Sequence, residues 1–237
     1  MSEINNLSVV MWATDGTHVE RAVTGAAAIA ARYSTNYEII IAAGPAATDA
    51  AARAAARPFV YATYHRQPRR PAYLLRDACT LIGGELVLAF DAATPPSASA
   101  LERLLTAYDG QDIITGMRTP APANLLHRTH TALLKQILVS DQADPLLPLA
   151  LFRAELIDLL PGDGELAPPL AHVYAVARRR NYTTAQIALP AHSAPTRPST
   201  IGDVASLAAQ GPARSTRPAL GTLIVVASLW LLLRRRR

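Results

Sequence analysis

The stretch Gly83-Gly84-Glu85-Leu86-Val87-Leu88-Ala89-Phe90-Asp91-Ala92-Ala93-Thr94-Pro95-Pro96 decides the fold that this sequence predicts. Its central part, 86–90, is continuously apolar, as expected of a parallel strand that is covered on both faces. The strand ends on Asp91, and a proline-containing turn and a helical pattern follow. Open α/β sheets bind their ligands beyond the carboxyl ends of such strands, which makes Asp91 the first candidate for a functional residue.

The segments on either side of this stretch alternate between short apolar runs and Ala- or Leu-rich helical patterns. Further strands are predicted at 7–12, 36–43, 59–64, 112–116 and 182–189. Helices are predicted at 18–32, 48–57, 72–82, 99–108, 125–139, 154–160 and 170–180. Strands that alternate with helices at this spacing predict right-handed βαβ units and a mostly parallel sheet, hence an α/β fold.

Length and composition place limits on the function. A chain of 237 residues is long enough for one large α/β domain, which we expect to span 1–190. The formal charge is +5, but the four arginines 234–237 supply most of it, so we expect no broad nucleic-acid-binding surface. The single cysteine, Cys79, excludes an intrachain disulfide and a multi-cysteine zinc site. It lies in an apolar run and is predicted to be an inert core thiol.

The end of the chain suggests a membrane attachment. A Pro-, Ser-, Ala- and Arg-rich linker is expected at 191–218, followed by an uncharged, mainly apolar segment at 219–233 and the basic tail 234–237. As a helix, 219–233 would span about 22 Å, short of a hydrocarbon core of roughly 30 Å. We predict a tail anchor whose arginines reach the interface; shallow insertion on anionic headgroups and a helix buried in a homo-oligomer are the alternatives. No secretory signal opens the chain, so the globular domain is expected in the cytoplasm.

The order of these motifs resembles family 2 glycosyltransferases of the GT-A fold, in particular the polyprenyl-phosphate sugar synthases. The residues that carry the resemblance are 8–15, similar to the opening strand, 37–41, similar to the second strand, 85–91, similar to the strand that bears the Asp-x-Asp metal motif, 144–155 and 178–190. The resemblance implies a sheet flanked by helices, a nucleotide-sugar donor held through Mg²⁺ or Mn²⁺, and a polyprenyl-phosphate acceptor.

The departures from this family fall at polar positions. The second acid of the metal motif is Ala93, and the acid pair expected after the second strand is Ala43-Gly44. The glycine-containing loop near the diphosphate is replaced by 68–71, Pro-Arg-Arg-Pro. A divalent metal is therefore disfavoured, and the guanidinium groups of this loop are candidates to neutralise a diphosphate in its place.

These observations yield a set of candidate residues. The predicted nucleotide-sugar-binding residues are Ala13, Asp15, Arg66, Arg69, Arg70 and Asp91. Asp91 is also the candidate metal ligand, and its alternative role is to cap the helix after Thr94-Pro95. His127, His130 and His172 are too scattered to predict a metal site, and Asp144 could equally serve a turn before Pro145.

No catalytic residue is assigned. The sequence predicts a membrane-associated glycosyltransferase-like protein with a degenerate donor site, in which sugar transfer is weak or metal-independent. The alternative is a non-catalytic relative that binds a protein partner, such as an active transferase, at the membrane.

Overall fold

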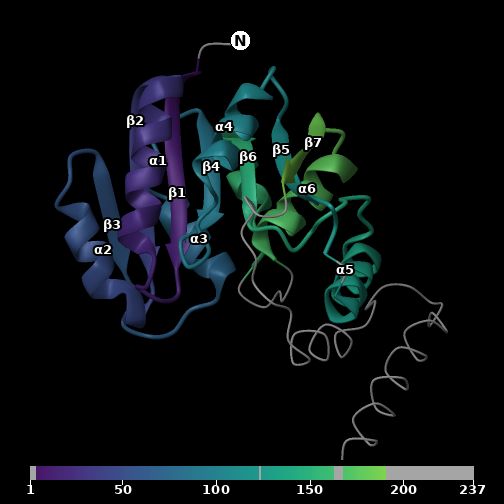
Figure 1. Ribbon diagram of the computed structural model, residues 1–237, viewed down its shortest axis with the longest axis horizontal. Coiled ribbons are helices and arrows are strands. Elements are labelled where there is room, and N and C mark those ends of the chain that lie inside the picture. Colours follow the sequence, from purple (N-terminus) through teal and green to yellow (C-terminus); the bar gives the residue numbers. More distant parts are fainter. Residues whose placement is uncertain (1–3, 123, 163–167, 191–237) are drawn as a thin grey trace, which may run out of the picture.

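The computed structural model describes residues 4–122, 124–162 and 168–190, and these form a seven-stranded sheet with helices on both faces (Figure 1). The strand order is β3-β2-β1-β4-β6-β5-β7. The strands are β1 Ile4–Ala13, β2 Ser34–Ala43, β3 Val60–Tyr64, β4 Leu86–Asp91, β5 Ile113–Thr119, β6 Leu149–Arg153 and β7 Thr184–Pro190.

The sheet is mostly parallel, as predicted. Strand β1 pairs in parallel with β2 and β4, β2 with β3, and β5 with β7. Only β6 runs the other way, between β4 and β5. Because β4 and β5 are both antiparallel to β6, they run in the same direction as each other. Their carboxyl ends therefore lie at the same edge of the sheet as those of β1, β2 and β3.

Two layers of helices cover the sheet. The α-helices are α1 Val19–Tyr33, α2 Thr48–Ala55, α3 Pro71–Cys79, α4 Ala98–Thr106, α5 Leu125–Leu138 and α6 Pro169–Arg179, with 3₁₀ turns η1 Pro45–Ala47 and η2 Ala154–Leu159. Successive residues of β1 point to opposite faces: Val9 and Met11 pack with α1, α2 and α4, whereas Val10 and Trp12 pack with α3 and α6. Helix α5 lies outside these layers and packs against α6 through Leu138 (Figure 1).

The predicted elements are confirmed with changes at their ends. The predicted helix 154–160 is the 3₁₀ turn η2, and the strand expected at 112–116 continues to Thr119. It continues because every residue of β5 from Ile113 to Thr119 has a partner on β7. Within the segment 144–153, the last five residues form β6. Cys79 is buried, and burial raises the pKa of its thiol to about 12, which agrees with an inert core cysteine.

The predicted C-terminal segments lie outside the described residues. These are the linker 191–218, the apolar segment 219–233 and the basic tail 234–237. None of the helices within the described ranges is long and apolar enough to cross a bilayer.

A partly buried hydrogen-bonded cluster joins the two glycines just before β4 to the middle of β1 and β2. The Ser8 hydroxyl donates to Glu38 Oε1 at 2.6 Å and accepts from the Gly84 N–H at 2.9 Å. The same Glu38 oxygen accepts from the Gly83 N–H at 2.5 Å. The close approach requires glycine at 84, because a Cβ there would lie 2.6 Å from the Ser8 hydroxyl oxygen and 2.8 Å from its backbone nitrogen.

We expect Gly84→Ala to lower the free energy of unfolding by about 1–3 kcal/mol, because the added methyl group must displace β1 or β4. The neighbouring Gly83→Ala is a matched control: its Cβ would sit 3.6 Å from Glu38 Oε1, an ordinary contact. This control should stay within about 0.5 kcal/mol of the wild type. Urea denaturation of the two variants measures both values, and equal stabilities would contradict the proposed role of the close approach.

Candidate functional site

Three of the predicted residues meet at the adjacent carboxyl ends of β1 and β4. Ala13 ends β1 and is fully buried, and its carbonyl oxygen accepts from the Gly44 N–H at 2.8 Å. Asp15 lies in the following turn, where its Oδ1 accepts from the Thr17 N–H at 3.0 Å. Asp91 ends β4 and stands opposite Trp12 of β1. The strand register therefore brings both carboxylates to one edge of the sheet.

Asp91 organises the turn that leads out of β4. The residue is 7% exposed, and its Oδ1 accepts from the Ala93 N–H at 2.9 Å, a local turn typical of aspartate. The predicted capping role is wrong: Ser97 caps α4, with its hydroxyl accepting from the Ala100 N–H at 3.2 Å.

Asp91 lacks the second acid of the metal motif that the family resemblance implies. Ala93 supplies a backbone N–H to the Asp91 carboxylate, where a second acid would have supplied a ligand. Among the residues that the structure describes, no group of three or more His, Cys, Asp or Glu side chains is arranged to hold a metal ion. Mg²⁺ at a nucleotide site is usually held by one or two carboxylates together with phosphates of the substrate. Ala93 removes one of the two carboxylates that the family resemblance implies for Mg²⁺ or Mn²⁺ and leaves Asp91 as the acid of this motif.

The arginine loop 66–70 follows β3 on the same edge. His65 anchors its start, because its N–H donates to Ala43 O at 2.9 Å and its Nε2 lies 3.0 Å from Asp77 Oδ2. The guanidinium of Arg69 stacks over Tyr73, 4.5 Å from the ring centre. Arg66 and Arg70 are exposed. Two arginines of the loop are thus open to an anion, whereas the third already packs on an aromatic ring.

The loop and Asp91 flank this edge without touching. Neighbouring strands are about 4.8 Å apart, so β3 lies roughly 10 Å from β1 and roughly 14 Å from β4. Between them lie β2 and β1, which end at Ala43 and Ala13. A ligand that contacts both the arginine loop and Asp91 must therefore extend past the ends of these two strands.

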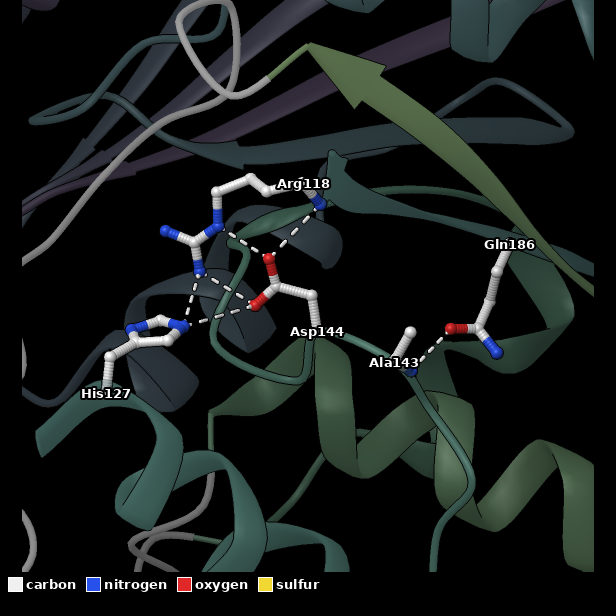
Figure 2. A network of polar contacts seen from close by, with 5 residues as sticks. All are labelled: Arg118, His127, Ala143, Asp144 and Gln186. Carbon is white, nitrogen blue, oxygen red and sulfur yellow. Dashed lines mark hydrogen bonds and ion pairs between the residues drawn. The ribbon is translucent and has the colours of Figure 1, made fainter. Parts of the chain in front are cut away.

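A second polar centre, which the sequence did not predict, lies further along the same edge. Arg118 of β5 forms a buried ion pair with Asp144, which precedes β6 (Figure 2). Arg118 Nε and Nη2 donate to the two carboxylate oxygens at 2.5 and 2.7 Å, and the Arg118 N–H adds a bond at 3.3 Å. The two side chains are 1% and 6% exposed, so this bidentate pair is nearly free of solvent.

His127 of α5 completes this centre and is held neutral. Its Nε2 lies 3.2 Å from Arg118 Nη2, and since guanidinium nitrogens only donate, Nε2 must accept and the proton must sit on Nδ1. Burial lowers the pKa of His127 below its usual value of 6.5, and Arg118 lowers it further, while Asp144 acts in the opposite direction. The ring therefore extends the Arg118–Asp144 pair without adding charge near neutral pH.

The loop that carries Asp144 is itself held in place. The Ala143 N–H donates to Gln186 Oε1 at 2.6 Å (Figure 2). Gln186 Nε2 in turn donates to the Tyr174 hydroxyl at 3.0 Å. These bonds connect the loop to β7 and α6. Asp144 is thus the fixed partner of Arg118, and it also serves the predicted turn before Pro145, because its carbonyl oxygen accepts from the Leu147 N–H at 3.2 Å.

Part of this centre could be inferred from the sequence. Asp144 lies in a stretch that resembles a motif of the family 2 glycosyltransferases, and His127 is one of three histidines that are scattered along the chain. Arg118 was missed because the strand 112–116 was predicted to end two residues before it. An extended strand would have placed Arg118 on the same face as Ile114, where a charged side chain needs a buried partner.

The environment of His127 predicts how stability depends on pH. Because the pKa of His127 is lower in the folded protein than in the unfolded chain, the unfolded chain binds the proton first as pH falls. The free energy of unfolding should therefore decrease from just above pH 6.5 downward. His127→Gln keeps an acceptor for Arg118 but does not titrate. Urea denaturation from pH 8 to pH 5 should show the advantage of wild type over this variant shrinking with falling pH; a constant difference would contradict the assignment.

Comparisons with known proteins were made at the level of sequence and of structure. No protein-family model matches the sequence, and no curated protein matches it in sequence. Solved structures do match. Glucosyl-3-phosphoglycerate synthase of Mycobacterium tuberculosis, in a complex with Mn²⁺, UDP and phosphoglyceric acid, superposes with a TM-score of 0.63 at 17% identity, over 86% of this chain and 74% of that one.

Two further structures give the same result. The same M. tuberculosis enzyme in complex with phosphoglyceric acid has a TM-score of 0.64 at 16% identity, over 86% and 76% of the two chains. A structure described as a mycobacterial protein has a TM-score of 0.62 at 18% identity, over 86% and 71%. At this level of identity the likeness concerns the fold. The chain has the GT-A fold of nucleotide-diphospho-sugar glycosyltransferases.

Proposed function

We propose that this chain is a glycosyltransferase-like protein that binds a nucleotide-sugar at the carboxyl ends of β1 to β4 without a divalent metal. The observation that carries the proposal is the arrangement of this edge: Asp15 and Asp91 lie at adjacent strand ends, and the exposed guanidinium groups of Arg66 and Arg70 lie beyond β2. The similar M. tuberculosis enzyme binds UDP together with Mn²⁺. In this chain the arginine loop is proposed to take over the neutralisation of the diphosphate.

The chemistry of the arginines suits this role. A guanidinium group presents a planar fork of N–H donors that matches two phosphate oxygens and remains charged at all physiological pH values. Arg66 and Arg70 would bind the diphosphate oxygens and stabilise the charge that develops on the departing nucleoside diphosphate. Asp15 would accept a hydrogen bond from the nucleoside. Without a metal to share this charge, sugar transfer is expected to be slow.

A second candidate function is supported by the state of Asp91. Its carboxylate already accepts the Ala93 N–H and is almost fully buried, so it serves the turn before α4. A domain that keeps this turn but lacks the second acid fits a non-catalytic relative that binds a protein partner, such as an active transferase. In this alternative the fold is retained because its surface binds the protein partner.

Binding of nucleotide-sugars separates the two. We expect UDP-glucose or GDP-mannose to bind equally well with and without Mn²⁺ in titration calorimetry. The double variant Arg66→Gln/Arg70→Gln should weaken binding by about tenfold or more, because two charge-assisted contacts are lost. Arg57→Gln is the matched control, since Arg57 bonds to Thr24 near the far end of α2.

Three other results would change the proposal. Binding that requires Mn²⁺ and is lost in Asp91→Asn would show a metal site. If none of the nucleotide-sugars binds, the non-catalytic alternative is favoured. If Arg57→Gln weakens binding as much as the double variant, the effect is one of net charge and the arginine loop is not the diphosphate site.

We also propose that the chain attaches to a membrane, on the basis of its C-terminal sequence. The proposed acceptor is a polyprenyl phosphate, and the globular domain is proposed to lie in the cytoplasm. The apolar segment 219–233 would bury in the bilayer, and arginines 234–237 would contact anionic headgroups. We expect the full chain to co-sediment with phosphatidylserine-containing vesicles, and a chain that ends at residue 218 to remain in the supernatant. Equal sedimentation of the two chains would contradict the anchor. Replacing the four arginines 234–237 by glutamines should weaken vesicle binding at low salt. The binding that remains should not depend on the salt concentration.

A further inference from the structure

Strand β3 forms an outer edge of the sheet that lacks the usual protection against pairing. It bonds to β2 on one side, and within the described ranges no strand lies on its other side (Figure 1). Edge strands of soluble proteins are commonly protected by a charged side chain, a proline or a bulge. Residues 59–64, Phe-Val-Tyr-Ala-Thr-Tyr, contain no charge and no proline, and β3 pairs with β2 without a bulge. This edge is therefore open to a further strand.

The outward backbone groups of β3 have no hydrogen-bond partner in the described part of the chain. In a parallel pair, the residues of an edge strand alternately bond to the neighbouring strand and face away from it. The His65 N–H donates to Ala43 O at 2.9 Å, so the odd-numbered residues of this segment bond to β2. Ala62 therefore directs its N–H and C=O outward, and Tyr64 directs its N–H outward. These groups can bond to an extended chain that lies alongside β3.

Exposed aromatic side chains lie on both faces of this edge. Tyr61 is 52% exposed and Tyr64 is 48% exposed. Val60 and Ala62 pack against the layer that contains α1 and α2. Because side chains alternate along a strand, Tyr64 lies on that face of the sheet and Tyr61 on the opposite face. A strand added to β3 would place its side chains beside both rings, and aromatic side chains pair well with β-branched ones across strands.

Phe59 gives a second indication that this edge meets a partner. Its φ is 61°, a left-handed conformation that is costly for a bulky side chain. The ring packs against Tyr37, with the ring centres 6.0 Å apart, yet 59% of the residue remains exposed. The fold therefore holds a strained aromatic residue in place without burying it, and strained residues cluster at sites that bind a ligand.

The charges around the edge decide what kind of strand fits. Arg57 precedes β3 and Arg66 follows it, and both side chains are exposed. Neither arginine forms an ion pair with an acid of the described ranges. Because both ends of the strand are basic, a second copy of β3 would bring arginines beside arginines in either direction, which is unfavourable. A strand with acidic residues at both ends matches the edge.

We propose that β3 binds an extended segment of a partner protein that has β-branched residues at its centre and acidic residues at both ends. The segment adds to the sheet as a new edge strand. Its backbone bonds to the outward groups of Ala62 and Tyr64, and its acids meet Arg57 and Arg66. The proposal does not rest on the binding of a nucleotide-sugar. It names the surface and the partner chemistry that the non-catalytic alternative leaves open.

The test uses the full chain and a synthetic peptide with a Thr-Val-Thr-Val-Thr core flanked by two glutamates on each side. Fluorescence anisotropy of the labelled peptide should show saturable binding. The same core flanked by lysines should bind about tenfold or more weakly, because like charges then meet at both ends. Amide hydrogen exchange, followed by NMR, should slow at Ala62 and Tyr64 when the acidic peptide binds. Tyr61 and Thr63 are an internal control, because their N–H groups already bond to β2.

Variants at the edge separate this binding from folding and from the nucleotide site. Ala62→Pro removes the outward N–H, a change that an edge strand tolerates, and should weaken peptide binding by about tenfold or more. Tyr61→Glu repels the acidic peptide from an exposed position and keeps the test valid if the proline variant does not fold. Arg57→Gln should weaken binding of the acidic peptide by about twofold to fivefold. All three variants should bind nucleotide-sugars as the wild type does. Arg180→Gln, which removes an exposed arginine at the end of α6, is the control for net charge and should bind the peptide normally.

Four results would overturn the proposal. The first is the absence of saturable binding of the acidic peptide up to about 1 mM. The second is equal binding of the acidic and the lysine-flanked peptides, which removes the argument from charge. The third is normal peptide binding by the folded edge variants, which places the peptide elsewhere. The fourth is a dimer of the full chain in sedimentation velocity that dissociates in Ala62→Pro, since a second copy would then occupy the edge.

Discussion

A strand that is buried on both faces can present polar groups to a ligand only at its ends, and the structure depends on this constraint. Residues 9–13 of β1 are almost completely buried, with alternate side chains packed into two separate helical layers. Residues 39–43 of β2 and all of β4 share this burial. The proposed nucleotide-binding residues therefore lie at or just after the carboxyl ends of β1, β3 and β4, as is general for open α/β sheets.

The central elements could be predicted from the sequence, because local patterns decide them. The apolar run of β4 and the amphipathic spacing of α4 reflect burial that each element achieves wherever it lies in the sheet. The ends of the elements could not be predicted, because contacts distant in sequence set them. Strand β5 continues to Thr119 only because β7 pairs with it, and β6 runs antiparallel because of its place between β4 and β5.

Likewise, the parts of the candidate site that depend on local sequence could be predicted, and the parts that depend on contacts distant in sequence could not. Asp15 and Asp91 could be identified because they lie at or just after the carboxyl ends of buried strands. The role of Asp91 in the turn to Ala93 could not, since the same residue in the same position is compatible with a ligand, a cap or a turn. Arg118 and Asp144 are 26 residues apart, and only the fold makes them partners. Replacing such a buried pair together by apolar residues is often tolerated, whereas removing one member is not, so the pair acts as a single unit.

The contact between Gly84 and Ser8 has a consequence at the opposite end of the sheet. It locks the start of β4 against β1, and β4 then runs without a bulge to Asp91, seven residues and about 23 Å away at about 3.3 Å per residue. A slip of one residue at the glycine would shift the Asp91 carboxylate by about 3.3 Å and turn it to the other face of the sheet. The absence of a side chain at Gly84 therefore helps to fix where the Asp91 carboxylate lies at the other end of β4.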